Sequence, residues 1–128
     1  MKILTGIDII EIDRIKKSID SLDGKFEKEI FTQSEIDYCE SKKKAKYQHY
    51  AARFAAKEAI FKAVSKTLDN KYEITWKNVE ILNDVNGRPY ISFIDTDICN
   101  KIQDIDISLS HCKLYATASV VLILNWFP

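Results

Sequence analysis

The stretch AARFAAKEAIFKAV, residues 51–64, decides the fold of this chain. It is rich in alanine, contains no glycine or proline and carries apolar residues at helical spacing. It therefore predicts the longest helix of the chain, from about residue 47 to residue 68. Around the axis of this helix, Arg53 and Lys57 fall inside the apolar arc, whereas Glu58 and Lys62 fall on its border.

Two interpretations of these charged side chains are open. In the first, the long stems of the bases cover apolar surface, and Glu58 and Lys62 form an ordinary ion pair four residues apart. In the second, this face of the helix lines an anion or metal site. Arg53, Lys57 and Lys62 then meet phosphates, and Glu58 holds a cation.

The elements expected on either side of the long helix predict an α+β fold. One strand is followed by a run of helices, and several strands come after the long helix, which favours a largely antiparallel sheet packed against that helix. Glu35 follows Thr32 at the spacing of a capping box, so a helix begins after Thr32. The expected elements are a strand at 2–12, helices at 13–22, 26–31 and after 32, strands at 72–82 and 90–94, a short helix at 96–103 capped by Thr96, strands at 105–111 and 114–124, and a tail at 125–128.

Composition narrows the class of protein. The 128 residues predict one domain, 1–128, and the 19 basic residues balance the 19 acidic ones. A neutral chain whose basic runs lack interleaved aromatics does not favour nucleic-acid binding. Cys39, Cys99 and Cys112 are far apart, which argues against a disulfide framework or a structural zinc site. No leader and no apolar run of about 20 residues is present, so we expect no membrane span and a cytoplasmic location.

The segment GIDIIEI, residues 6–12, places a carboxylate inside a predicted strand. Asp8 lies among isoleucines, where an unpaired charge is costly. In the plain interpretation Asp8 lies at a strand edge, acts as a cap or forms a salt bridge to a base such as Arg14. In the functional interpretation it is a ligand for a hard cation. Magnesium takes one or two protein carboxylates and fills its remaining positions with water and phosphates, a pattern that Asp8 and Glu58 would suit.

Three further features each have a plain and a functional interpretation. The turn NDVNGRP, residues 83–89, is either a simple hairpin turn or a loop that brings Arg88 towards a phosphate. His111 is either a turn residue or a proton carrier or phosphate donor. The lysines of residues 42–46 form either a solvated surface or the fringe of a phosphate site.

Together these segments resemble the holo-acyl-carrier-protein synthase family, the small single-domain type of 4'-phosphopantetheinyl transferase. The matching pieces are GIDIIEIDRI at 6–15, FEKEIFTQSEIDYC at 26–39, ARFAAKEAIFKAV at 52–64, NDVNGRP at 83–89 and SLSHCKLYATASVVL at 108–122. They occur in the family's order across nearly the whole chain. The resemblance implies the fold of that family.

It also implies transfer of phosphopantetheine from coenzyme A to a serine of apo-acyl-carrier protein, releasing adenosine 3',5'-bisphosphate. The family's magnesium ligands match Asp8 and Glu58, and the family's lysine beside the coenzyme A phosphates matches Lys62. With His111, these residues form the implied catalytic set. The implied contacts to coenzyme A are Lys44, Arg53, Lys62, Gly87, Arg88, Pro89 and His111. Relatives of this length are usually trimers whose active sites lie at subunit boundaries.

One departure concerns the carrier protein. The family's first helix often carries several arginines that bind the acidic recognition helix of the carrier. Here Arg14 is present and Lys16 and Lys17 are nearby, but Asp20 and Asp23 follow. Arg14 and Lys17 are the expected carrier contacts. A non-catalytic relative that binds coenzyme A or the carrier, and a scaffold whose basic helix only docks an acidic protein, are the competing functions.

Overall fold

The computed structural model describes residues 1–68 and 74–125, apart from the side chain of Lys66. Residues 72–73 of the expected strand and 126–128 of the expected tail lie outside this range. The helices and strands are β1 (Lys2–Glu11), α1 (Ile12–Ser21), α2 (Lys25–Ile30), α3 (Gln33–Ser41), α4 (Lys46–Val64), β2 (Val79–Asn83), β3 (Pro89–Phe93), β4 (Ile102–His111) and β5 (Tyr115–Leu124). Short 3₁₀ turns occupy Lys43–Ala45, Ser65–Thr67, Trp76–Asn78 and Ile98–Lys101.

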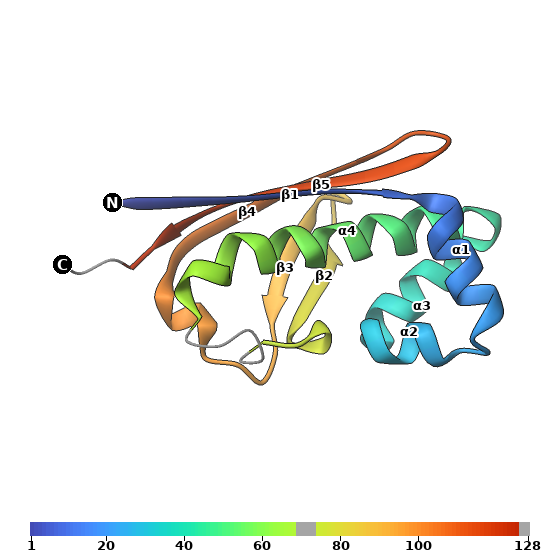
Figure 1. Cartoon of the computed structure of the whole chain (residues 1–128), viewed down its shortest axis with the longest axis horizontal. Coiled ribbons are helices and arrows are strands. Elements are labelled where there is room, and N and C mark those ends of the chain that lie inside the picture. The colour runs from blue at the N-terminus through green and yellow to red at the C-terminus, as the bar shows by residue number, and fades with distance from the viewer. Residues whose placement is uncertain (69–73, 126–128) are drawn as a thin grey trace.

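The fold is α+β, and its largest sheet lies along α4. This sheet has the strand order β1-β5-β4, and both pairs are antiparallel. Figure 1 shows α4 running beneath the sheet along most of its length. Small and branched residues alternate into that interface from β5, where Ala118 and Val120 are buried. The predicted antiparallel sheet against the long helix is confirmed, although a second sheet is also present.

The second sheet is the hairpin of β2 and β3, which lies on another side of α4 (Figure 1). Helices α1, α2 and α3 gather around the first half of α4 at the opposite end of the molecule from both termini (Figure 1). As a result α4 is covered on several sides, and 11 of its 19 residues are buried. This explains why its charged side chains cannot all face solvent.

Gly6 allows β1 to approach α4 closely. A methyl group on Gly6 would lie 1.8 Å from the carbonyl oxygen of Ala59 and 3.0 Å from the amide nitrogen of Ala63. Only glycine fits at such a distance from helix backbone. The next inward-facing residue of the strand is Asp8, so this contact also brings Asp8 against α4.

The prediction of a strand over 72–82 is wrong at Trp76–Asn78, which forms a 3₁₀ turn. The side chain of Asn78 accepts a hydrogen bond from the backbone nitrogen of Thr75 at 2.7 Å, and this local bond replaces strand pairing. The strand begins only at Val79. Within residues 1–68 and 74–125, no helix combines the length and apolar character needed to cross a bilayer.

Candidate functional site

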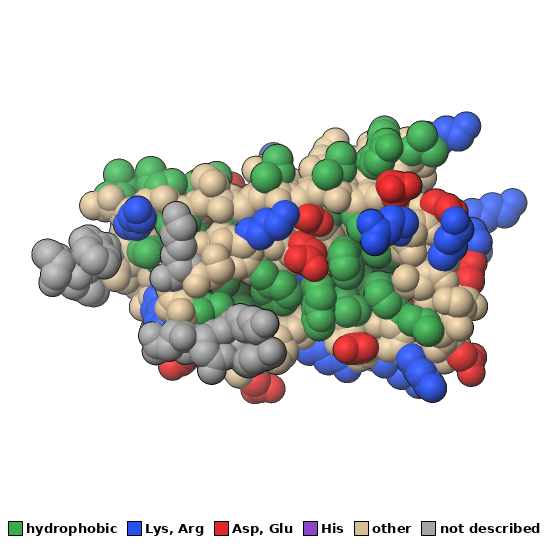
Figure 2. Space-filling view, viewed as in Figure 1, with side chains coloured by type: hydrophobic (Ala, Val, Ile, Leu, Met, Phe, Trp, Pro, Cys, Tyr) green, Lys and Arg blue, Asp and Glu red, His purple; other side chains and the backbone are tan. Residues whose placement is uncertain are grey.

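Asp8, Glu58 and Lys62 lie together where β1 meets α4. The Lys62 ammonium is 3.1 Å from a carboxylate oxygen of Asp8 and donates a 2.9 Å hydrogen bond to the carbonyl oxygen of Ile7. Neither the helix pair Glu58–Lys62 nor the pair Asp8–Arg14 occurs among the salt bridges of the described residues. Figure 2 shows acidic and basic side chains side by side over the middle of this face.

The electrostatics of this cluster favour a cation. Burial raises the pKa of Glu58, and the negative charge of Asp8 raises it further, while Lys62 lowers it. Two carboxylates that repel each other offer hard oxygen ligands, and Lys62 supplies only one positive charge to them. The described residues contain no cluster of three or more histidine, cysteine or acidic side chains suited to a metal. The residues therefore fit an open magnesium site with at most two protein carboxylates.

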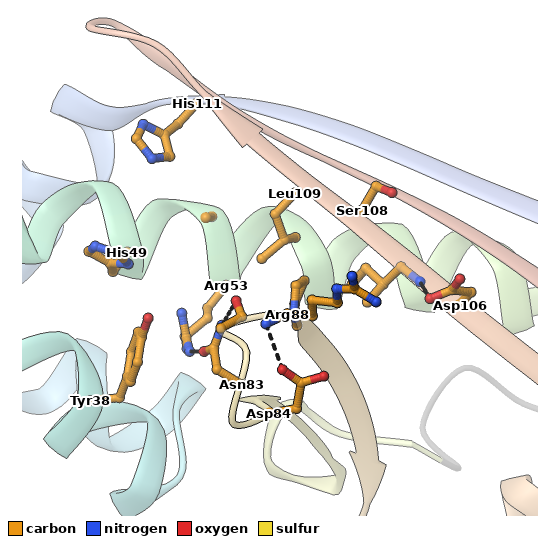
Figure 3. Close-up of a pocket in the computed structure, with 14 residues that line it drawn as sticks. Tyr38, His49, Arg53, Asn83, Asp84, Arg88, Asp106, Ser108, Leu109 and His111 are labelled. Atoms are coloured by element: carbon orange, nitrogen blue, oxygen red, sulfur yellow. Dashed lines mark hydrogen bonds between the residues drawn. The ribbon is translucent and has the colours of Figure 1, made fainter.

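A pocket of about 650 Å³ lies between α4, β4 and the β2–β3 turn. Figure 3 shows Tyr38, His49 and Arg53 on one side of it and residues of β4 on the other. Five of the residues expected to contact coenzyme A line this pocket: Arg53, Gly87, Arg88, Pro89 and His111. Segments far apart in the sequence thus meet at one concave surface.

Arg53 is the most constrained cation in the pocket. It is only 2% exposed, and its guanidinium donates to the side-chain oxygen of Asn83 at 2.5 Å and lies 4.1 Å from the centre of the Tyr38 ring. Its Nε has no hydrogen-bond partner, and among the described residues Arg53 forms no salt bridge. A buried guanidinium without a carboxylate favours an anionic ligand in the pocket.

The β2–β3 turn is held by hydrogen bonds to the side chain and the backbone of Asp84. The Asp84 carboxylate accepts hydrogen bonds from the amides of Asn86 and Arg88, and the amide of Asp84 donates to the carbonyl of Arg88 at 2.9 Å. Gly87 has a φ of 80°, which glycine adopts without strain. These bonds fix the backbone at the mouth of the pocket (Figure 3).

The remaining predicted residues lie elsewhere. Lys44 lines a second pocket, of about 520 Å³, with Lys16, Tyr47 and Lys113, and not the pocket around Arg53. Arg14 and Lys17 are exposed on α1 and line neither pocket, and Lys17 is 2.9 Å from Asp13.

Asp8, Glu58 and Lys62 do not line the Arg53 pocket either. Glu58 follows Arg53 by five residues, which turns it by about 140° around the helix axis. The two halves of the predicted site therefore face different sides of α4 within one chain.

Sequence reasoning missed three residues around Arg53. His49 precedes Arg53 by one helical turn, and its pKa is lowered by burial and by the nearby charge of Arg53. The spacing of one helical turn between His49 and Arg53 could have indicated from the sequence that the two residues share a face of the helix. Tyr38 stands edge-on to His49 at 5.5 Å between ring centres, and Asn83 binds Arg53, but nothing in the local sequence of either one indicates these contacts.

Similar proteins were found by sequence and by structure. The family model of the 4'-phosphopantetheinyl transferase superfamily matches residues 5–119. A holo-(acyl-carrier-protein) synthase of Ruminiclostridium cellulolyticum is 44% identical over 98% of this chain and 95% of its own length. A holo-(acyl-carrier-protein) synthase of Protochlamydia amoebophila is 42% identical over 91% of this chain and 93% of its own length.

The similar solved structures include proteins with a bound nucleotide ligand. The Helicobacter pylori holo-(acyl-carrier-protein) synthase in complex with coenzyme A has a TM-score of 0.81 and is 30% identical, covering 94% of this chain and all of its own. The Bacillus anthracis holo-(acyl-carrier-protein) synthase, in complex with CoA (3',5'-ADP), has a TM-score of 0.76 and is 37% identical, covering 93% of this chain and 94% of its own.

The fold, the residues gathered at the two faces of α4 and these matches agree with one another. The expected family is confirmed over nearly the full length of the chain. The chain belongs to the 4'-phosphopantetheinyl transferase superfamily.

Proposed function

We propose that this chain, acting as one domain, is the enzyme that transfers 4'-phosphopantetheine from coenzyme A to a serine of apo-acyl-carrier protein. The products are holo-carrier protein and adenosine 3',5'-bisphosphate. The observation that carries this function is the near-full-length match to holo-acyl-carrier-protein synthases, which include proteins solved with coenzyme A or 3',5'-ADP. The non-catalytic alternative is not favoured, because Asp8, Glu58 and Lys62 are all retained and lie together.

Asp8 and Glu58 would hold a magnesium ion in this enzyme. When bound, the ion would neutralise the charge that develops on the pyrophosphate as its bond breaks. Lys62 adds a fixed positive charge beside the same carboxylates. Burial is the first cause of the raised pKa of Glu58 and the negative charge of Asp8 the second, and a divalent cation between the two carboxylates would offset both effects.

The Arg53 pocket is proposed to bind the nucleotide part of coenzyme A. Among the described residues its buried guanidinium forms no salt bridge, and Arg88, His49 and His111 line the same surface, which favours phosphates there even though Asp84 and Asp106 also line the pocket. Gly87 and Pro89 shape the mouth of the pocket. Lys44 is proposed to meet the 3'-phosphate from the second pocket.

The reaction forms one bond and breaks one. The serine hydroxyl oxygen attacks the phosphorus that carries the pantetheine group, and the bond from that phosphorus to adenosine 3',5'-bisphosphate breaks as the hydroxyl proton leaves. We assign no side chain as the base. His111 is a candidate of second rank for the base. It lines the Arg53 pocket, a position that suits substrate binding better than proton abstraction.

The acidic helix of the carrier protein is proposed to dock on α1. Arg14 is exposed there, whereas Lys17 pairs with Asp13 and Lys16 with Asp20 at 2.6 Å. The neighbouring carboxylates partly neutralise both lysines, whereas Arg14 forms no salt bridge among the described residues. Carrier recognition by this chain is therefore expected to depend on Arg14 more than on either lysine.

A homotrimer with shared active sites is proposed as the working form. Ile3, Ile7, Ile9 and Val121 are 46–66% exposed on the outward face of the sheet, where antiparallel register places Thr5 opposite Val121. Figure 2 shows hydrophobic side chains along this margin, over β1 and β5. Covering such a patch favours assembly, and a neighbouring subunit would bring its Arg53 pocket to the Asp8–Glu58 carboxylates.

Mass spectrometry of apo-carrier after incubation with enzyme, coenzyme A and magnesium tests the function. We expect the carrier to gain the mass of one phosphopantetheine, and the gain to disappear when a chelator removes magnesium. Candidate fatty-acid and polyketide carriers are compared in parallel. A carrier that stays unmodified while calorimetry still detects coenzyme A binding would show the non-catalytic relative instead.

A further inference from the structure

Lys57 has no role in the site described above, although it directly precedes Glu58. Its side chain is completely buried, and its ammonium is 2.6 Å from a carboxylate oxygen of Glu35, whose side chain is equally buried. The same ammonium donates to the carbonyl oxygens of Ile30 at 2.8 Å and Trp76 at 3.0 Å. Lys57 therefore has three acceptors for its three protons, and it joins α4 to the end of α2 and to the 3₁₀ turn before β2.

Glu35 uses both carboxylate oxygens in this contact. One accepts from Lys57 and also from the amide of Thr32 at 2.9 Å, which completes the predicted capping box of α3. The other accepts from the amide of Ile81 at 2.8 Å. Ile81 belongs to β2, which among the described residues pairs only with β3, so Glu35 satisfies a donor on the other edge of that strand.

The next residue on the same side of β2 is Asn83, whose side chain binds Arg53. Arg53 precedes Lys57 by one turn of α4, so two adjacent contacts join the same face of the helix to the same strand. One passes from Lys57 through Glu35 to Ile81, and the other passes directly from Arg53 to Asn83. The backbone beyond Asn83 is the turn that lines the Arg53 pocket.

A buried ion pair is a weak source of stability, because apolar residues of the same volume stabilise a core equally well or better. The Lys57–Glu35 pair differs from an apolar contact because its hydrogen bonds are directional. Its hydrogen bonds allow one position of β2 relative to α4, whereas apolar side chains tolerate sliding. This favours a role in geometry over a role in stability.

We propose that Lys57 and Glu35 are positioning residues for coenzyme A binding, holding the β2–β3 hairpin at the distance from α4 that the Arg53 pocket requires. The proposal rests on the proposed function for its ligand. Lys57 itself does not touch the substrate. It acts through Ile81 and the strand that carries Asn83.

Steady-state kinetics and hydrogen exchange test the pair in the full chain. In Lys57→Met and Glu35→Gln, we expect the KM for coenzyme A to rise about tenfold or more while kcat changes much less, because ground-state contacts are lost. The Ile81 amide is expected to lose protection from hydrogen exchange in both variants. If a single variant does not fold, Lys57→Met/Glu35→Gln removes both charges and keeps the test available.

Ile19→Ala is the matched control, because Ile19 is buried in the cluster around α1, whereas Ile81 belongs to the other core cluster. It is expected to lower the melting temperature, and Ile19 takes no part in the hydrogen bonds of Lys57 and Glu35. A KM for coenzyme A that rises as much in Ile19→Ala as in Lys57→Met would overturn the proposal, and so would an Ile81 amide that stays protected. If wild-type enzyme fails to modify any carrier, the proposed function fails, and the exchange measurement still decides whether the pair holds β2.

Discussion

Glu58 experiences two opposing influences on its charge. Burial and the neighbouring Asp8 raise its pKa, and Lys62 lowers it, with a net rise. In the metal-free protein the folded state therefore holds the Glu58 proton at a higher pH than the unfolded state does. The free energy of unfolding falls as pH increases from the ordinary pKa of glutamate to the raised one. Glu58, which serves the proposed chemistry, therefore lowers the free energy of unfolding at neutral pH.

We expect Asp8→Asn to lower the pKa of Glu58, because it removes the negative charge of Asp8 and leaves the burial unchanged. NMR titration of the Glu58 carboxyl carbon in metal-free protein measures this directly. Glu11 is exposed on the same strand and provides the control carboxyl. A Glu58 titration that is unchanged by Asp8→Asn would show that the two carboxylates do not interact.

The contact between β1 and α4 determines the position of Asp8 relative to the helix. Gly6 and Asp8 face the helix from the same strand, and the backbone of Ala59 lies where a side chain on Gly6 would go. The helix contributes Glu58 and Lys62 beside that contact. The close approach of the two elements is thus a condition for the two carboxylates to meet.

Gly6→Ala is expected to push β1 away from α4, since the atoms it would strike belong to helix backbone and cannot rotate away. We expect a loss of about 1–3 kcal/mol in the free energy of unfolding, together with slower transfer. Chemical denaturation and the carrier-modification assay measure the two effects. Lys2→Ala, which removes an exposed side chain at the start of the same strand, should change neither by much. A stable and fully active Gly6→Ala would contradict the account of this contact.

The same elements show what the sequence can and cannot predict. Local patterns are readable: the capping box of Thr32 and Glu35 and the long alanine-rich helix were both predicted and are both present. The partner of Lys57 was not predicted, because Glu35 lies 22 residues away and its capping role already explained it. The expected strand over 72–82 was wrong at Trp76–Asn78, because a side-chain hydrogen bond overrode the strand propensity of the segment.

Family resemblance supplied what local patterns did not. The helical periodicity alone did not decide between two interpretations of the charged side chains on α4. Their stems could cover apolar surface, or the side chains could form a ligand site. The structure separates them: Lys57 is a core residue, Arg53 lines a pocket, and Glu58 and Lys62 lie beside Asp8. The missing information was the position of β1 and of the β2–β3 hairpin relative to the helix, which depends on contacts between residues far apart in the chain.

At the scale of the whole molecule, the outward face of the large sheet is proposed to determine the oligomeric state. We expect Ile7→Glu to convert the proposed trimer to a monomer, since Ile7 is 66% exposed in one chain and the new charge would be buried between subunits. Light scattering with size-exclusion chromatography measures the mass in solution. Leu22→Glu is the control, because Leu22 is 46% exposed on the end of α1 and away from this sheet. A trimer that survives Ile7→Glu would exclude this face as the interface.

The central claim is that Asp8 and Glu58 act as one site for phosphopantetheine transfer. The most direct test is the rate at which Asp8→Asn and Glu58→Gln modify apo-carrier, followed by mass spectrometry with saturating coenzyme A and magnesium. We expect each variant to fold and to lose about 10²-fold or more in kcat, because each removes a metal ligand that acts on the developing charge. Turnover close to that of the wild type by either folded variant would contradict the claim.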